Sequence, residues 1–259
     1  MTELDTQQIS SFDGQILAVH RLKDAAGGKP VLLLHGLFSD AAMNWVKFGH
    51  AERLAAAGFD PIMPDLRAHG RSAVPVDAAA YPADVLALDT AAIVEALHLQ
   101  DYDLVGFSLG ARTAVRGVVG GLAPRRLILA GMGLEGLAGW NDRAAFFIDA
   151  IDRFETVKQG DPAFFAVQFM KSMKVNRPAA RLLLQSVSDT TQEELAAITM
   201  PTLVLCGAKD RDNGSPQALA DALPSARFHE VPGTHMSSVT EAALGEAIVS
   251  FLKQDTVPD

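Results

Sequence analysis

A serine between two glycines is the first feature of this sequence that could perform covalent chemistry. The motif Gly106-x-Ser108-x-Gly110 follows an apolar run and precedes a helical pattern. This spacing predicts a nucleophile elbow, a sharp strand-to-helix turn that exposes the serine hydroxyl. The glycines remove Cβ atoms that would clash in such a turn. The motif alone is also compatible with an ordinary turn before a helix, so other residues must decide between the two interpretations.

A serine hydroxyl is unreactive unless a base lies within hydrogen-bond reach, and the base needs a carboxylate that orients it. His235 is the best candidate for the base, because it follows a strand-like run at residues 227–231 in a Gly-x-His arrangement. Asp210 is the preferred carboxylate, because it comes soon after another apolar run. Asp212 is the alternative, although an aspartate before Asn-Gly is well suited to be only a turn former.

Two backbone N–H groups are expected to stabilise a negatively charged oxygen beside this serine. Leu109 directly follows the serine, and Leu37 lies in the loop after an apolar run that ends in His-Gly. His35 and His69 lie in loops of their own, where they are expected to hold loop geometry by hydrogen bonds. His229 lies inside a strand-like run and is expected to be structural.

The order of apolar runs and helical patterns indicates an α/β fold with a mostly parallel, doubly wound sheet. A hairpin is expected around Asp13-Gly14, and strands and helices alternate after it. Catalytic and binding sites on such sheets lie at the carboxyl ends of the strands. Strands are predicted at 31–34, 59–63, 104–107, 126–130, 202–206 and 227–231, and helices at 51–57, 83–97, 109–119, 216–222 and 241–252.

Composition narrows the range of partners. The 22 basic and 31 acidic side chains give 22 − 31 = −9, and no run of lysine or arginine occurs, which argues against nucleic acid or an anionic membrane as a partner. The polar, acidic start of the chain and the lack of a long apolar stretch favour a cytoplasmic protein. We expect a small-molecule substrate, and the oligomeric state is left open.

Cofactors and metals are not expected. The single cysteine, Cys206, lies inside a predicted buried strand and is interpreted as core. The histidines are scattered, and the sequence contains no His-x-x-x-His pair that would indicate a catalytic metal. No dinucleotide fingerprint or phosphate-binding loop is present either.

Five motifs in this order resemble the α/β-hydrolase superfamily, particularly its small bacterial members that are similar to serine esterases or carbon–carbon bond hydrolases. They are His35-Gly36, the stretch from Asp65 to Ser72, the elbow at 106–110, Gly207-x-x-Asp210 and Gly233-x-His235. The sequence departs from the common pattern at Ala68 and Ala111, where the superfamily often has glycine. Both residues are small and leave the three candidate catalytic residues in place.

The resemblance implies a serine hydrolase that cleaves small, largely apolar carboxylic esters or lactones through an acyl-enzyme. Serine at position 108 argues against the dehalogenase and epoxide-hydrolase branches, which need a carboxylate there. Three alternatives remain open. The first is hydrolysis of a carbon–carbon bond in a diketone-type ring-cleavage product by the same three residues, and the second is perhydrolysis like that of haloperoxidases. The third is a ligand receptor on the same fold without activity.

The alternation of strands and helices stops between residues 133 and 195, where helical patterns follow one another. The superfamily carries a helical cap at this place. Residues 1–132 and 196–259 are therefore expected to form the core domain, and 133–195 the cap. Asp161-Pro162 and Thr190-x-x-Glu193 are read as helix starts. Most apolar side chains of the cap are expected to pack as core, and a few to line the pocket. The pocket candidates are Phe38, Phe107, Met132, Phe146, Phe165, Phe169 and Met173.

Overall fold

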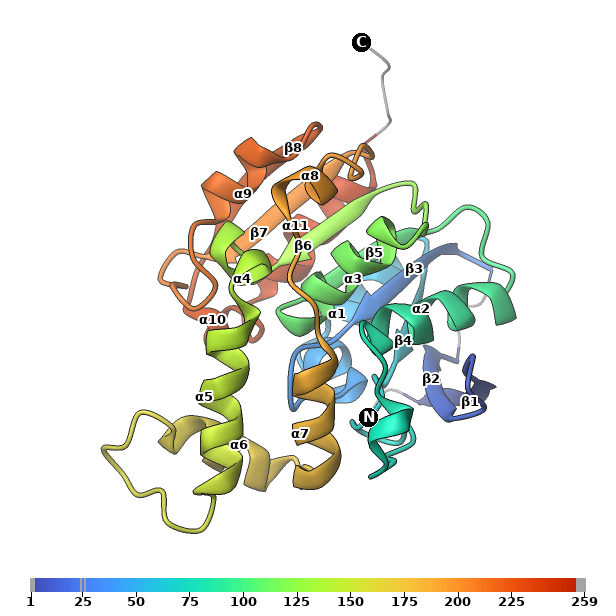
Figure 1. Cartoon of the computed structure of the whole chain (residues 1–259). Helices are drawn as coiled ribbons and strands as arrows, with labels where there is room; N and C mark the ends of the chain where they lie inside the picture. The colour runs from blue at the N-terminus through green and yellow to red at the C-terminus, as the bar shows by residue number, and fades with distance from the viewer. Residues whose placement is uncertain (1–2, 24, 26, 255–259) are drawn as a thin grey trace.

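A single eight-stranded sheet forms the centre of the molecule (Figure 1). The computed structural model describes residues 3–23, 25 and 27–254, so the outermost residues of the predicted core domain lie outside the described part. The strand order is β1-β2-β4-β3-β5-β6-β7-β8. The first two strands form the predicted hairpin, β2 is antiparallel to β4, and all other neighbours are parallel. The strands are β1 (Leu4–Ser10), β2 (Ile16–Leu22), β3 (Lys29–Leu34), β4 (Phe59–Pro64), β5 (Asp103–Phe107), β6 (Leu127–Ala130), β7 (Thr202–Gly207) and β8 (Ala226–Val231).

Helices cover both faces of the sheet, as the continuous apolar strands predict. Successive side chains of a strand point to opposite faces, so Leu33 and Leu34 belong to two separate hydrophobic clusters. One face is covered by α1 (His50–Ala56) and α11 (Ala242–Leu252), and the other by α2 (Val85–Ala96), α3 (Leu109–Val119) and α9 (Pro216–Ala222). None of the helices in the described ranges combines the length and hydropathy that crossing a membrane requires.

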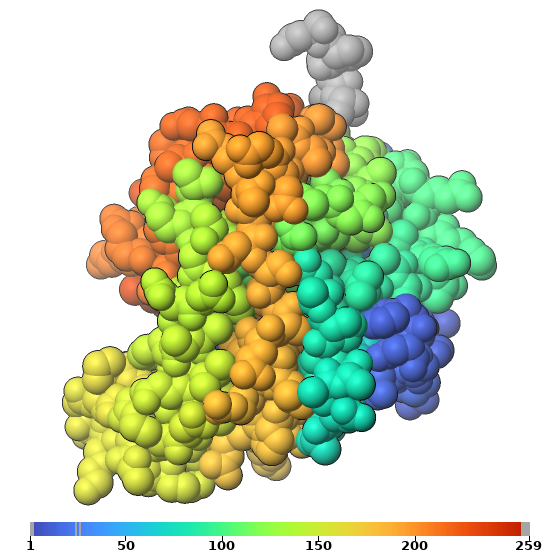
Figure 2. Space-filling model, viewed as in Figure 1, coloured from blue at the N-terminus to red at the C-terminus, as the bar shows by residue number. Residues whose placement is uncertain are grey.

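A run of helices separates β6 from β7, in the region where the alternation stops in the sequence. It consists of α4 (Leu134–Ala138), α5 (Trp140–Asp152), α6 (Phe164–Ser172), α7 (Arg177–Ser186) and α8 (Gln192–Leu195), and we call it the inserted segment. In Figure 1, α5 and α7 run away from the sheet with α6 across their far ends. Figure 2 shows this part as a lobe continuous with the rest of the surface.

Two predicted helix starts in the inserted segment are wrong in register. The capping box is formed by Thr191 and Glu194, not by Thr190 and Glu193. The helix expected to start at Asp161 begins later. Asp161 accepts the N–H of Ala163, and regular helix starts only at Phe164. A shift of one residue leaves the local sequence pattern almost unchanged, so the pattern alone does not fix it.

One arginine ties both ends of the inserted segment to the helix that follows the serine. Arg112 of α3 is fully buried and donates to the carbonyl oxygens of Gly136 and Leu137 at the start of the segment. The same guanidinium donates to the carbonyl oxygen of Ser188, after α7, at 3.0 Å and lies over the ring of Trp140. The two ends of the segment therefore meet at Arg112.

Two neutral histidines lock together the loops that follow β3 and β4. His35 donates through Nδ1 to the carbonyl of Gly36 and accepts the N–H of Leu66 at 3.0 Å. His69 donates to the carbonyl of Arg67 and accepts the N–H of Phe38, also at 3.0 Å. Each ring thus stabilises the other loop, which confirms the predicted loop-holding role of both histidines. Burial, reinforced by the neighbouring His35, lowers the pKa of His69 to about 3.

The loop after β4 is held by side-chain partners from distant parts of the chain. Arg67 pairs with Asp13 and Asp89. Asp65 accepts a hydrogen bond from the buried His20 at 3.0 Å. Burial alone would raise the pKa of Asp65, but the bond from His20 and two backbone N–H groups help lower it to about 2. The sequence did not predict the partners of Arg67 and Asp65, because these partners lie far away along the chain, in the opening hairpin and in α2.

Stability should fall as the pH is lowered from about 6.5 towards 3. Burial lowers the pKa of His35, His50 and His69 in the folded protein. In the unfolded chain a histidine takes up a proton near pH 6.5, so below that pH and above its lowered pKa in the folded protein the unfolded state binds more protons than the native state. Each buried histidine then contributes a slope of about 1.4 kcal/mol per pH unit. Denaturant unfolding at a series of pH values measures the slope.

Replacing His69→Gln removes the titrating ring. The difference between the protons bound by the unfolded and the native state should then fall by about one, so the slope should flatten. The exposed His98 provides the matched control, since His98→Gln should leave the slope unchanged. A free energy of unfolding that stays constant between pH 6 and 4 in the unsubstituted protein would contradict the neutral histidine pair.

Candidate active site

Ser108 occupies a sharp turn between β5 and α3, with φ 55° and ψ −113°. A methyl group built on Gly106 would lie 2.2 Å from the carbonyl oxygen of Gly110. One built on Gly110 would lie 2.2 Å from the carbonyl oxygen of Leu34. Both positions therefore exclude any side chain, as the spacing of the motif predicts. A positive φ is energetically unfavourable for a residue other than glycine, and here Ser108, whose hydroxyl the turn exposes, adopts it.

A continuous chain of hydrogen bonds joins Ser108 to two residues from other strands. His235 Nε2 lies 2.9 Å from Ser108 Oγ, and His235 Nδ1 lies 2.9 Å from Asp210 Oδ2. All three residues are buried. Asp212 is exposed, and its backbone N–H donates to Asp210 Oδ1 at 3.0 Å. The structure thus brings Asp210, and not the alternative Asp212, to the imidazole.

The charge on Asp210 fixes the direction of the hydrogen bonds. Burial would raise the pKa of Asp210, but the hydrogen bond from His235 helps lower it below its ordinary value. A carboxylate accepts only, so His235 donates through Nδ1 and keeps Nε2 as acceptor for the Ser108 hydroxyl. The arrangement can accept a proton from the serine and stabilise the imidazolium that results.

The loop after β3 borders this serine, and the hydrogen bonds of its amides separate Leu37 from its two neighbours. The N–H of Gly36 donates to Asn44 Oδ1 at 3.1 Å, and that of Phe38 donates to His69. Within the described ranges, no acceptor is found for the N–H of Leu37 between them. Phe38 has φ 61°, a left-handed conformation that is unusual for a bulky residue. The loop is therefore held in a strained shape that leaves the N–H of Leu37 unused.

The two amides predicted for a developing oxyanion lie on elements that flank Ser108. A methyl group built on Gly36 would lie 3.6 Å from Ser108 Cβ, so the loop with Leu37 contacts the nucleophile. Leu109 begins α3, and the first N–H groups of a helix have no acceptor within it. The start of a helix also carries partial positive charge, which favours an anion there.

One group of side chains in the described ranges has the composition of a metal site. Ligand atoms of Asp210, Asp212 and His235 lie within 4.8 Å of one another. Both ring nitrogens of His235 and one oxygen of Asp210 already belong to the hydrogen-bonded chain. The donor set therefore fits proton transfer better than metal coordination.

The predicted pocket residues fall into three groups. Phe38, Phe107 and Met132 are buried, and the ring of Phe107 lies 5.2 Å from that of His235. Phe169 is half-buried against the same hydrophobic cluster as Phe38 and Met132. The last three are Met173, which lines an open surface hollow of about 330 Å³, Phe146, which is partly exposed, and Phe165, which is 83% exposed. The exposure of Phe165 contradicts its expected position in the pocket lining.

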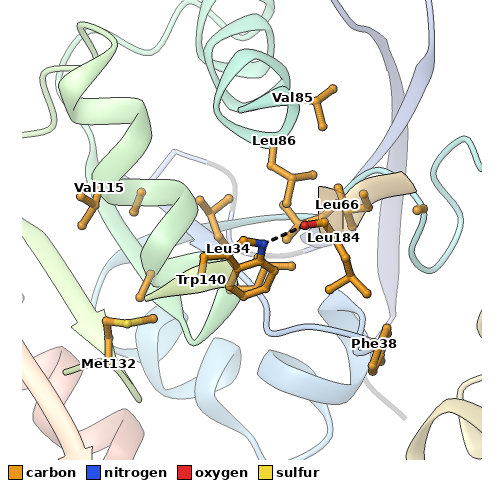
Figure 3. Close-up of a cluster of buried hydrophobic side chains, with 14 of the residues drawn as sticks. Leu34, Phe38, Leu66, Val85, Leu86, Val115, Met132, Trp140 and Leu184 are labelled. Carbon is orange, nitrogen blue, oxygen red and sulfur yellow. Dashed lines mark hydrogen bonds between the residues drawn. The ribbon is translucent and has the colours of Figure 1, made fainter. Parts of the chain in front are cut away.

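Two aromatic residues of α5 were missed as lining candidates. Trp140 is buried among Leu34, Leu66 and Met132, and its indole N–H donates to the carbonyl oxygen of Leu184 at 2.8 Å (Figure 3). Phe147 packs edge-on against Phe38, with ring centroids 5.5 Å apart. Their spacing along a helix could have identified them, because Trp140, Ala144 and Phe147 lie on one face.

Comparison with known proteins identifies the family and supports the fold. Residues 31–246 match the profile of the family described as "Alpha/beta hydrolase family". The AB hydrolase superfamily protein YisY of Bacillus subtilis (strain 168) is 29% identical over 213 residues, which cover 73% of this chain and 77% of that protein. An epoxide hydrolase of Caballeronia sordidicola is 35% identical over 98 residues, 38% of this chain and 29% of that one.

A solved structure extends the likeness over nearly the whole chain. The esterase EaEST from Exiguobacterium antarcticum matches with a TM-score of 0.79 at 22% identity, covering 96% of this chain and 99% of that chain. At this identity the match concerns the fold. Because the family profile spans most of the sequence and the described strands and helices agree with its fold, the chain belongs to the alpha/beta hydrolase family.

Proposed function

We propose that this protein is a serine hydrolase that uses Ser108, His235 and Asp210 as a catalytic triad. The observation that carries this proposal is the hydrogen-bonded chain from Ser108 Oγ through His235 to Asp210, with both distances at 2.9 Å. A lone elbow serine could be structural, but a buried imidazole between a hydroxyl and a carboxylate has the geometry that nucleophile activation requires.

The reaction follows from the hydrogen-bond directions. His235 takes the proton of Ser108 as Oγ attacks the acyl carbon, and Asp210 stabilises the imidazolium. The N–H groups of Leu37 and Leu109 bind the oxyanion. His235 then protonates the leaving group, and a water molecule, activated by the same imidazole, hydrolyses the acyl-enzyme. No metal or cofactor is needed for these steps.

The proposed substrates are small carboxylic esters or lactones with a largely apolar part. The buried side chains of Phe38, Phe107 and Met132 favour such groups, and the name of the esterase from Exiguobacterium antarcticum points the same way. The epoxide hydrolase relative covers a minor part of the chain. An alkyl-ester intermediate needs a carboxylate as nucleophile, whereas this elbow carries a serine. Carbon–carbon bond hydrolysis uses the same triad and remains the alternative within enzymes.

We further propose that the inserted segment is the cap of this site. Trp140 and Phe147 of α5 reach the hydrophobic cluster that contains Phe38 and Met132. Contacts of this kind bind substrate groups remote from the reacting carbon, whereas the triad lies on the core. A non-catalytic receptor would keep the cap but would not need an activated serine.

Replacing Ser108→Ala should lower kcat by about 10³-fold or more, because the nucleophile is lost. A fluorophosphonate probe should label the unsubstituted protein at Ser108, as located by peptide mass spectrometry. Full activity in the variant, or a label on another residue, would refute the proposed nucleophile. Binding of esters without any turnover would instead favour the receptor.

Replacing Asp210→Asn should reduce kcat by about 10³- to 10⁴-fold, because an amide favours the wrong imidazole tautomer and cannot stabilise the imidazolium. Asp212→Asn is the matched control in the same loop and should retain most of the activity, since the side chain of Asp212 is exposed. Steady-state kinetics on one ester, with thermal unfolding of each variant, provide the measurement. Equal losses in both variants would reject the assignment of Asp210.

Truncating Phe147→Ala should change the preference for acyl-chain length, because its ring packs against Phe38, which follows the proposed oxyanion donor Leu37. Each lost methylene contact is worth about 1–3 kcal/mol of discrimination. Phe165→Ala removes an equal side chain that is 83% exposed, and should keep the original profile. Values of kcat/KM for a graded ester series test both. Matching profiles for the two variants would argue against a specificity role for α5.

A further inference from the structure

Helix α5 contacts both loops that carry proposed catalytic groups, the loop after β7 with Asp210 and the loop after β3 with Leu37. Trp140 anchors the start of the helix, and Arg143 and Phe147 follow at spacings of three and four residues, on one side of it. The guanidinium of Arg143 donates to the carbonyl oxygen of Asp212, two residues from the triad carboxylate. The ring of Phe147 packs against Phe38, next to the Leu37 amide.

Arg143 and Phe147 also touch each other. The guanidinium carbon of Arg143 lies 5.8 Å from the centroid of the Phe147 ring. A continuous series of contacts therefore runs from the loop of Asp210, through Arg143 and Phe147, to the loop of Leu37. Ser108 is hydrogen-bonded through His235 to the first loop and borders the second. The charge of Arg143 is thus held close to the proposed reaction centre.

The partners of Arg143 differ from those of the other arginines in the inserted segment. Arg153, Arg177 and Arg181 each form an ion pair with an aspartate or glutamate. Arg143 is half-buried, and within the described ranges it forms no ion pair with a carboxylate. Its hydrogen-bond partner is a neutral carbonyl oxygen, so most of the five N–H donors of its guanidinium are left unused.

An unpaired cation in this position is costly without a counter-charge. Burial lowers the pKa of Arg143, and only the more distant charges of Asp212 and Asp210 oppose that effect. A partly desolvated charge is stabilised by an ionic partner, because desolvation is otherwise only partly compensated. The apolar ring of Phe147 lies against the guanidinium and supplies no counter-charge. A ligand carboxylate at this position would supply a compensating negative charge.

We propose that Arg143 binds a carboxylate carried by the substrate away from the scissile bond, so that the preferred substrates are monoanionic esters or lactones of dicarboxylic or similarly acidic compounds. This inference rests on the proposed hydrolase function and specifies the substrate class of the same site. A planar guanidinium binds a carboxylate through two parallel hydrogen bonds, which would orient the acyl group relative to Ser108.

The test compares two substrates that differ only in charge, p-nitrophenyl hydrogen glutarate and its neutral methyl ester. The unsubstituted protein should have the higher kcat/KM on the monoanion. In Arg143→Met the ratio of kcat/KM values, anionic over neutral, should fall by about 10- to 100-fold, mainly through KM, as expected for loss of charge-assisted hydrogen bonds. Arg143→Lys should retain part of the preference, because the charge remains.

Arg181→Met is the matched control. It removes another half-buried arginine of the inserted segment, which pairs with Asp152, and should leave the ratio unchanged. Equal preference for both esters in the unsubstituted protein would overturn the proposal. So would an equal loss on both esters in Arg143→Met, since Arg143 would then only position the loop of Asp210. Thermal unfolding, with Arg143→Gln as a second variant, separates either result from a folding defect.

Binding measurements separate this proposal from the proposed catalysis. Calorimetry with monomethyl glutarate on the Ser108→Ala protein should give a dissociation constant that rises about 10- to 100-fold when Arg143→Met is added. If the unsubstituted protein hydrolyses no ester and Ser108 takes no label, the hydrolase function fails while this binding result still tests Arg143. If esters are hydrolysed but the monoanion binds no better than dimethyl glutarate, the anion site alone is rejected.

Discussion

The close approach of backbone to backbone at the elbow is the constraint on which the rest of the site depends. Gly106 faces the carbonyl of Gly110, and Gly110 in turn faces the carbonyl of Leu34 at the end of β3. These contacts press α3 against two neighbouring strands, so the serine can only lie at the carboxyl edge of the sheet. Every other group of the site then has to come from loops at that edge, as happens in parallel sheets.

The loops that meet the serine are held by hydrogen bonds from side chains that take no proposed part in the chemistry. His35 and His69 exchange bonds between two loops, and each must remain uncharged to accept an amide N–H. Their burial lowers their pKa values and keeps them neutral. The ring of His235 instead links a hydroxyl to a carboxylate. The same type of side chain thus holds the loops in one place and has the proposed role in proton transfer in another. The difference lies in the partners.

The sequence predicted the sheet, its covering helices and the two residues, His235 and Asp210, that continue the hydrogen-bonded chain from Ser108, because these depend on local periodicity and on motifs at strand ends. Contacts that join distant segments were harder to predict. The partners of Arg67 come from the hairpin and α2, and nothing near Arg67 in the sequence identifies them. Phe165 lies in the same apolar cluster of sequence as Phe169, yet it faces outward. Which side of a short helix is buried depends on docking, which composition alone does not determine.

The hydrogen bonds of Arg112 attach the inserted segment to the core without depending on the side chains of that segment. Both ends of the inserted segment attach to this one side chain, through the carbonyls of Gly136, Leu137 and Ser188. Backbone carbonyls are present whatever the side chains are, so a helical segment of another length or sequence can attach in the same way if its ends return to these points. With the proposed role of the segment as the cap of the site, substrate preference can diverge through exchange of the whole segment, while the proposed triad on the core is inherited without alteration.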